Sequence, residues 1–302
     1  MPNNPSALPP VGHRSGKKSS LAKIISRLQR LPRILSNYVG YAWVNMRYGN
    51  VKHFDLHFGG VHVRYSTEDF LSRQWFFPDL AGGKIYEESV TRLLMTHLVQ
   101  SRCFADVGTH LGYYSCLAGK LMLQRPVYGF EMSQATSNVT RRNIELNQLQ
   151  NVHLLNAAVS DTVGTASYER RRRYTGAGTR MLTNKDNDNK TITVPAVTLD
   201  TFFADKPVTP DLFKIDVEGA EMNVLRGMQQ LLRKHPTLFL EVHPHNLPSF
   251  DSSVEEILAF LRNEGYQLAE IVGIRTFGAT SNIRKLNQGD TVTTNTMIYA
   301  HI

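Results

Sequence analysis

Short apolar runs alternate with amphipathic segments from about residue 102 to the end of the chain. Runs such as Cys103–Val107 and Val127–Phe130 are typical of strands that are buried on both faces of a parallel sheet. The segments between them, such as Tyr113–Leu123, space their apolar residues as a helix does. This alternation predicts an α/β fold in which helices cover both faces of a mostly parallel sheet.

The same pattern continues through the rest of the domain. Further strands are predicted at Val152–Asn156, Leu212–Val217, Thr237–Val242, Tyr266–Val272 and Thr296–His301, and further helices at Asn138–Asn147, Glu221–Lys234 and Val254–Asn263. A helix through Leu93, Leu94 and Leu98 leads into this region. Open α/β sheets bind ligands at the carboxyl ends of their strands, so we expect the functional residues there.

Composition divides the chain into three regions. We expect a basic, partly disordered N-terminal arm at residues 1–50, a β-rich lead-in at 51–85 and the main domain at 86–302. The arm holds eight Lys and Arg residues and no Asp or Glu, so it accounts for the whole net charge of +8. Residues 1–20 are rich in Pro, Asn, Ser and Gly, a composition that favours disorder.

The arm contains one segment with helical spacing. Leu21, Ile24, Ile25 and Leu28 alternate with Lys and Arg residues, which predicts a basic amphipathic helix. Such a helix can dock on its own domain, lie on an anionic membrane surface or belong to a targeting presequence. Peripheral contact with the inner membrane surface through residues 21–46 is therefore one of three open interpretations. No apolar stretch has the length of a membrane span.

The two cysteines, Cys103 and Cys116, are too few for a disulfide framework and lack the spacing of a metal site. We therefore expect a protein of the reducing cytoplasm. No nucleic acid partner is expected, because the region after residue 50 is neutral overall. An oligomer is compatible with the sequence.

The strongest local signal is the heptapeptide Asp106–Gly112, which lies between a predicted strand and a predicted helix. Gly108 permits a tight turn, and Gly112 permits a close approach of the backbone to a ligand. The N-terminus of the helix attracts a carboxylate, such as that of S-adenosylmethionine (SAM). The glycine spacing differs from the G-x-G-x-x-G of dinucleotide enzymes, which favours SAM.

An acid at the end of the next strand supports this interpretation. Glu131 follows Gly112 by 19 residues, the position from which an acid accepts hydrogen bonds from both ribose hydroxyls. Residues at the end of the third strand are expected near the adenine. The expected cofactor-binding set is Asp106, Gly108, Thr109, His110, Gly112, Tyr113, Glu131, Met132, Asn156, Ala157 and Asp216.

A long insert separates the third and fourth predicted strands. It contains Arg170–Arg173 and a polar run, Asn184–Lys190, before strand character resumes at Thr191–Leu199. We interpret the insert as either a mobile lid or a solvated surface loop. The arginines could bind a phosphate group, such as that of a nucleotide-linked sugar.

Several ordered motifs over roughly residues 86–245 resemble the FkbM methyltransferase family. They are Asp106–Gly112, Arg142–Asn147, Ala157–Asp161, Val197–Asp200, Lys214–Glu221 and Val224–Gly227. The resemblance implies a class I, Rossmann-like methyltransferase fold with a seven-stranded, mostly parallel sheet. It also implies O-methylation of a sugar, a glycan or a natural product. His110 departs from the family, which usually has Ala or Asn at this position.

Methyl transfer to an alcohol requires alignment of donor and acceptor, and it is aided by a base. His243 and Asp216 follow two neighbouring central strands, so we predict His243 as the general base or acceptor-orienting residue. Asp216 is predicted to lie near the sulfonium or the acceptor hydroxyl. Lys214 is expected to pair with Glu241 or another buried acid. Asp216, Glu241 and His243 have the ligand types for Mg²⁺, but their spacing does not demand a metal, and we predict none.

Two other functions remain as alternatives. One is a nucleic-acid methyltransferase that uses the basic arm, although the chain has no Asn/Asp-Pro-Pro-Tyr/Phe motif and neither cysteine follows a proline. The other is a SAM-binding adapter without catalysis.

Overall fold

The computed structural model describes residues 39–302 except 41, 81–83, 170–180, 183–190 and 275–281. The chain divides after Arg47 into two compact units. In the first, residues 42–47 are helical. The predicted disordered start, the amphipathic helix from Leu21 and most of the insert with Arg170–Arg173 lie outside the described residues. Within the described part, no helix has the length and apolarity needed to cross a membrane.

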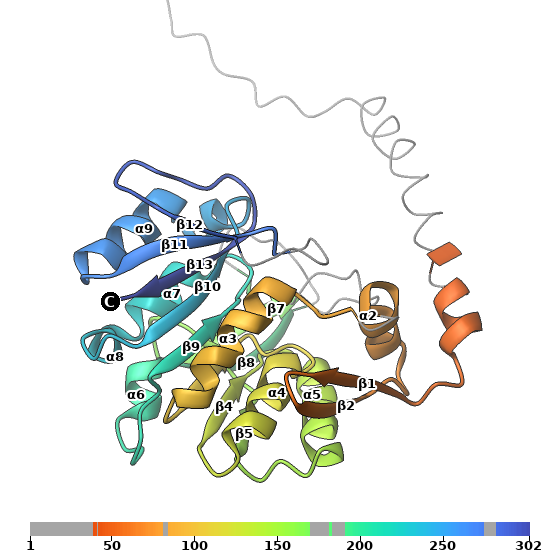
Figure 1. The fold of residues 1–302 in the computed structure, drawn as a ribbon. Coiled ribbons are helices and arrows are strands. Elements are labelled where there is room, and N and C mark those ends of the chain that lie inside the picture. Colours follow the sequence, from red (N-terminus) through yellow and green to blue (C-terminus); the bar gives the residue numbers. More distant parts are fainter. Residues whose placement is uncertain (1–38, 41, 81–83, 170–180, 183–190, 275–281) are drawn as a thin grey trace, which may run out of the picture. The chain divides into compact units, whose positions relative to one another are not determined.

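The second unit, Tyr48–Ile302, contains a central sheet of eight strands in the order β12-β11-β13-β10-β9-β3-β4-β5 (Figure 1). The strands are β3 (Phe104–Val107), β4 (Val127–Phe130), β5 (Val152–Leu155), β9 (Leu212–Ile215), β10 (Thr237–Val242), β11 (Gln267–Val272), β12 (Asn282–Lys285) and β13 (Thr296–His301). The five strands from β10 to β5 are parallel, and β13 is antiparallel to both of its neighbours.

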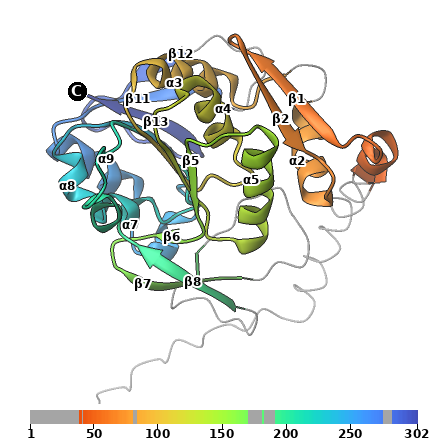
Figure 2. The same cartoon turned by 90° about the horizontal axis from the view of Figure 1, so that it is seen from below.

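Helices lie on both faces of this sheet (Figure 2). One face carries α3 (Glu88–Gln100), α4 (Tyr113–Met122) and α5 (Gln134–Leu146). The other carries α6 (Leu199–Phe203), α7 (Glu221–Arg226), α8 (Gln229–Leu232) and α9 (Val254–Asn263). The predicted α/β class, with helices on both faces of a mostly parallel sheet, is confirmed. The sheet has eight strands rather than the seven expected, because β12 extends the edge beside β11.

The predicted boundaries hold best where a strand is wholly apolar. Other elements differ from the predicted boundaries or have no predicted counterpart. The predicted helix Glu221–Lys234 is two helices, because Gly227 lies between them and a Cβ there would be 2.1 Å from the Ser160 carbonyl oxygen. Helix α5 begins four residues earlier than predicted, because Ser133 caps it by accepting a hydrogen bond from the Thr136 amide.

The lead-in contains a helix as well as strands. The hairpin of β1 (His53–Phe58) and β2 (Val61–Ser66) is followed by α2 (Phe70–Leu80), which the pattern of the sequence did not predict. Asp69 starts this helix by accepting a hydrogen bond from the Ser72 amide. The helix packs through aromatic side chains, and Phe76 stacks on Phe54 at 5.3 Å.

A second, three-stranded sheet lies beside the end of β5 (Figure 2). Its strands are β6 (Ala158–Val159), β8 (Thr191–Val197) and β7 (Gly164–Glu169), in that order. The turn of the 3-10 helix η1 (Leu247–Phe250) follows β10. The loops that leave β3, β4, β9 and β10 therefore meet at one edge of the central sheet.

Candidate active site

A cavity of about 210 Å³ lies at this edge of the sheet. The turn after β3 and the ends of β4, β9 and β10 form most of its wall, and Trp75 and Tyr86 complete it. The predicted residues that line it are Asp106, Gly108, Thr109, His110, Tyr113, Glu131, Met132, Ala157, Asp216 and His243. Gly108 and Glu131 thus share one cavity, as the sequence predicts.

The turn after β3 depends on Gly108. Its φ of +81° lies in the left-handed region, and a Cβ built on it would lie 1.8 Å from the carbonyl oxygen of Asp216. The amides of Gly108 and Thr109 both donate to the Phe130 carbonyl, each at 2.9 Å. The turn is therefore fixed against both neighbouring strands, β4 and β9.

Gly112 and Asn156 are in contact with neighbouring protein segments. Gly112 has a φ of +80°, and a Cβ there would lie 2.7 Å from Cγ2 of Thr140, so the close approach that it permits is to helix α5 rather than to a ligand. The Asn156 side chain donates to the carbonyls of Glu131 (2.7 Å) and Met132 (3.1 Å). Among the described residues, neither Gly112 nor Asn156 is part of the cavity lining.

Glu131 is held by the backbone at the end of β4. Its Oε2 accepts a hydrogen bond from the His110 amide at 3.0 Å, and its Oε1 accepts one from the Ser133 amide at 2.7 Å. Burial raises the pKa of Glu131 to about 8, and the neighbouring Asp216 and Asp106 add to the rise. The fixed carboxylate therefore faces a cavity in which its charge is poorly compensated.

Asp106 is a buried acid in the lining of the same cavity. Its Oδ2 accepts hydrogen bonds from the hydroxyls of Thr109 and Ser115, each at 2.7 Å. Its Oδ1 is buried and has no partner in the described structure. Burial raises the pKa of Asp106. An unsatisfied carboxylate oxygen at a cavity wall is a site for a cationic or hydrogen-bonding ligand.

Aromatic residues from α2 and from the segment before α3 form a wall of the cavity that the sequence pattern does not predict. Trp75 of α2 packs 5.8 Å from the rings of both His110 and Tyr113, and Tyr86 packs 5.4 Å from Tyr113. His110 has a φ of +52°, and burial lowers its pKa to about 4, so it is neutral at physiological pH. No local sequence pattern predicts that Trp75 lies at the site, because only the tertiary fold brings α2 to this edge.

Lys214 forms an ion pair with Asp216, one of the acidic residues of the cavity. Its Nζ lies 3.2 Å from Oδ2 of Asp216 and 4.9 Å from the centre of the Tyr114 ring. Burial alone would lower the pKa of Lys214, but Asp216, Glu87 and other acids raise it overall. Lys214 thus pairs with an acid, as expected, but the acid within salt-bridge distance is the partly buried Asp216 rather than Glu241.

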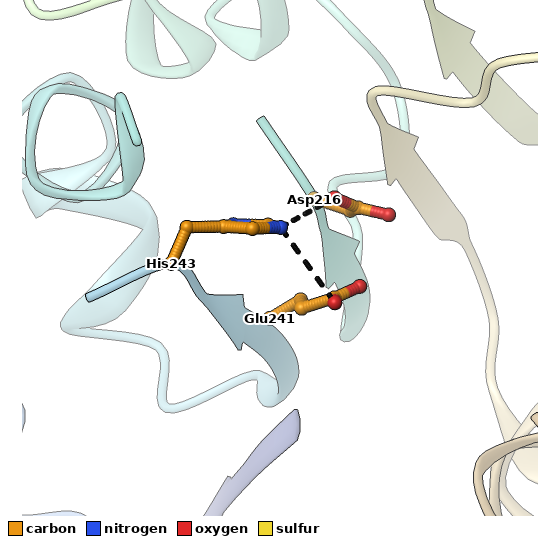
Figure 3. A group of neighbouring side chains, drawn as sticks. All are labelled: Asp216, Glu241 and His243. Atoms are coloured by element: carbon orange, nitrogen blue, oxygen red, sulfur yellow. Dashed lines mark ion pairs between the residues drawn. The ribbon is translucent and has the colours of Figure 1, made fainter. Parts of the chain in front are cut away.

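His243 lies among four acidic side chains. Its Nδ1 is 2.6 Å from Oε1 of Glu221, and its Nε2 is 3.6 Å from Glu241, 3.7 Å from Glu218 and 3.8 Å from Asp216. Burial alone would lower its pKa, but the Glu221 hydrogen bond and the nearby carboxylates raise it to about 9. Figure 3 shows Asp216, Glu241 and His243 pointing toward one another.

The fold and this site define a class of protein. A sheet with this strand order, a glycine turn after its first central strand and an acid at the end of the next have the design of the class I methyltransferases. The sequence model of the Methyltransferase FkbM domain matches residues 106–268, more than half of the chain. The chain belongs to the FkbM methyltransferase family.

Individual relatives are more distant. The hexuronic acid methyltransferase AglP of Haloferax volcanii is 24% identical over 203 residues, which cover 67% of this chain and 79% of AglP. A putative O-methyltransferase of Klebsiella pneumoniae superposes with a TM-score of 0.43 and 12% identity, over 74% of this chain and 82% of that one. An O-methyltransferase of Bacillus cereus in complex with SAH (S-adenosylhomocysteine) superposes with a TM-score of 0.43 and 13% identity, over 74% of this chain and 83% of that one. TM-scores this low carry no information on function.

The Gly108 contact leads to a first prediction. Gly108→Ala places a Cβ against the Asp216 carbonyl, whereas Gly60→Ala, at a φ of +79°, places one in open space. Both variants lose about 1–2 kcal/mol to the left-handed backbone, so we expect Gly108→Ala to unfold at clearly lower denaturant concentration than Gly60→Ala. Equal unfolding midpoints would show that the turn can move away from β9.

The buried carboxylate of Glu131 leads to a second prediction, on the pH dependence of stability. The pKa of Glu131 rises from 4.5 to about 8 on folding, so its ionisation opposes folding, and its contribution to stability falls as pH increases from about 4.5 to 8. Glu131→Gln removes this effect. We expect the melting temperature of the variant, relative to the unmodified protein, to rise with pH across that window. The exposed Glu145→Gln should follow the unmodified protein, and a Glu131→Gln curve parallel to it would contradict the burial argument.

Proposed function

We propose that the protein is a SAM-dependent O-methyltransferase that acts on a hydroxyl group of a sugar or glycan. One observation carries the proposal: the Glu131 carboxylate and the Gly108 turn share a cavity with the cluster of Asp216, Glu241 and His243. A single pocket therefore offers groups for a nucleoside at one side and polar groups for an acceptor at the other.

The residues of the cavity suit SAM. Glu131 is held so that its two oxygens can accept further hydrogen bonds, as a ribose with two hydroxyls requires. The unpartnered Oδ1 of Asp106 suits the ammonium group of the methionyl end. Phe130, Met132 and Ala157 line the cavity and offer apolar surface to the adenine. When bound, SAM supplies a methyl group activated by the positive charge on sulfur.

The acceptor hydroxyl is expected at Asp216, Glu241 and His243. These groups form hydrogen bonds with the hydroxyl and orient its oxygen toward the methyl carbon. In the transfer, a C–O bond forms, the C–S bond breaks with its electron pair left on sulfur, and the hydroxyl proton passes to this acidic cluster. Because the groups of the cluster interact strongly, we assign the proton to the cluster rather than to one residue.

Two observations support a sugar acceptor. The relative AglP is a hexuronic acid methyltransferase, and the match to it covers 79% of its length. Trp75, Tyr86 and Tyr113 offer flat aromatic surface at the cavity wall, against which the apolar face of a sugar ring can pack.

We expect Glu131→Ala to weaken SAM binding, because two ribose hydrogen bonds to the carboxyl group are lost. Such bonds contribute roughly 0.5–1.5 kcal/mol each, and more where the acceptor is charged, so the dissociation constant should rise about tenfold. Isothermal titration calorimetry measures the change, with the exposed Glu145→Ala as control. An unchanged affinity would remove Glu131 from the ribose site.

His243→Ala should separate binding from transfer. We expect SAM affinity close to that of the unmodified protein and a turnover lower by roughly 100-fold or more, the scale of a lost acid–base or orienting group. Turnover is measured as SAH formed with neutral sugars, uronic acids and glycans as acceptors, and the product as a methyl ether by mass spectrometry. Full activity of the variant, or a methyl group found on nitrogen, would contradict the proposal.

A further inference from the structure

The imidazole of His243 faces two carboxylates across a short gap. Its Nε2 lies 3.6 Å from Oε1 of Glu241 and 3.8 Å from Oδ1 of Asp216 (Figure 3). One ligand atom from each of the three residues lies within 4.8 Å of the other two. All three side chains line the cavity, so the gap between them opens to the acceptor side of the pocket.

The other ring nitrogen of His243, Nδ1, is hydrogen-bonded to Glu221. Its Nδ1 lies 2.6 Å from Oε1 of Glu221, and both residues are buried. With the hydrogen on Nδ1, the imidazole directs its Nε2 lone pair into the gap. A histidine that donates through one nitrogen to a carboxylate while the other points at a cluster of oxygen atoms has the arrangement found in metal sites, where the carboxylate fixes the ring.

The groups around the gap suit a cation. One imidazole nitrogen and two carboxylates border it, and carboxylates attract positive charge. Lys214 is paired with the other oxygen of Asp216, Oδ2, at 3.2 Å from its Nζ. The distances of 3.6 and 3.8 Å from Nε2 to Glu241 and Asp216 are longer than hydrogen bonds.

The cavity as a whole also has an excess of acids. Five acidic side chains line it, together with one lysine, Lys214. The acids are Asp106, Glu131, Asp216, Glu218 and Glu241. Two ligand atoms on one divalent ion lie roughly 3–4 Å apart, given metal–ligand distances of about 2.1 Å. The separations around Nε2 match that range.

We propose that Asp216, Glu241 and His243 bind a divalent metal ion that holds the acceptor hydroxyl. The inference rests on the proposed function for the identity of the acceptor, but the site itself is defined by these three residues. A bound ion would lower the pKa of the hydroxyl. Because the three residues of the cluster would then be ligands, the hydroxyl proton would pass to the neighbouring Glu218, whose Oε2 lies 3.7 Å from Nε2. Glu221 acts as a positioning residue, since it fixes the ring without touching the ion.

Mn²⁺ is the probe, because it accepts both imidazole and carboxylate ligands and its free form is counted by electron paramagnetic resonance. With the full chain stripped by EDTA, we expect saturable binding of one ion per chain. Glu241→Gln should weaken it by at least tenfold, and Glu221→Gln by roughly 10–100-fold, the usual effect of losing such a partner. The exposed Glu145→Gln is the control. Circular dichroism confirms that each variant is folded, and Asp216→Asn replaces Glu241→Gln if that variant is not.

Three outcomes would overturn the proposal: no saturable binding, equal binding by Glu241→Gln and the unmodified protein, or full methyl transfer in excess EDTA. SAM affinity is measured in EDTA on the same samples. If the protein in EDTA binds SAM and transfers the methyl group, the metal site is rejected and the proposed function is retained. Mn²⁺ binding without SAM binding would instead reject the proposed function.

Discussion

The contact between the turn after β3 and the end of β9 is the constraint on which the site depends. Gly108 packs against the Asp216 carbonyl so closely that a Cβ would lie 1.8 Å from its oxygen. The same turn is hydrogen-bonded to the end of β4, which carries Glu131. Because these contacts join backbones, they fix the distance between the proposed donor side and acceptor side of the pocket. Side-chain rearrangement cannot change that distance.

The pocket combines this rigid frame with uncompensated charge. Burial raises the pKa of Glu131 and Glu241 to about 8 each, and Lys214 pairs with only one oxygen of Asp216. Such an arrangement opposes folding, because buried carboxylates lack enough cationic partners. A site that accepts this penalty is suited to bind positive charge, which the sulfonium of SAM and a divalent ion would both bring.

Much of this arrangement can be predicted from local sequence. Strands such as Val127–Phe130 and Thr237–Val242 have a largely apolar sequence, and their boundaries match the structure. Gly108 and Glu131 belong to a strand–turn–helix unit whose spacing fixes where they meet. Trp75 could not be predicted, because α2 reaches the site only through tertiary packing. Likewise, the break at Gly227 depends on the Ser160 carbonyl, which is distant in sequence.

The central claim is that Glu131 and the Gly108 turn hold a nucleoside, and a crystal structure of the protein with SAH tests it most directly. The account predicts both ribose hydroxyls within hydrogen-bond distance, about 2.5–3.2 Å, of the Glu131 carboxylate. It also predicts the amino-acid end beside Asp106 and the sulfur facing His243. Electron density for SAH at another place, or a ribose bound without contact to Glu131, would contradict it.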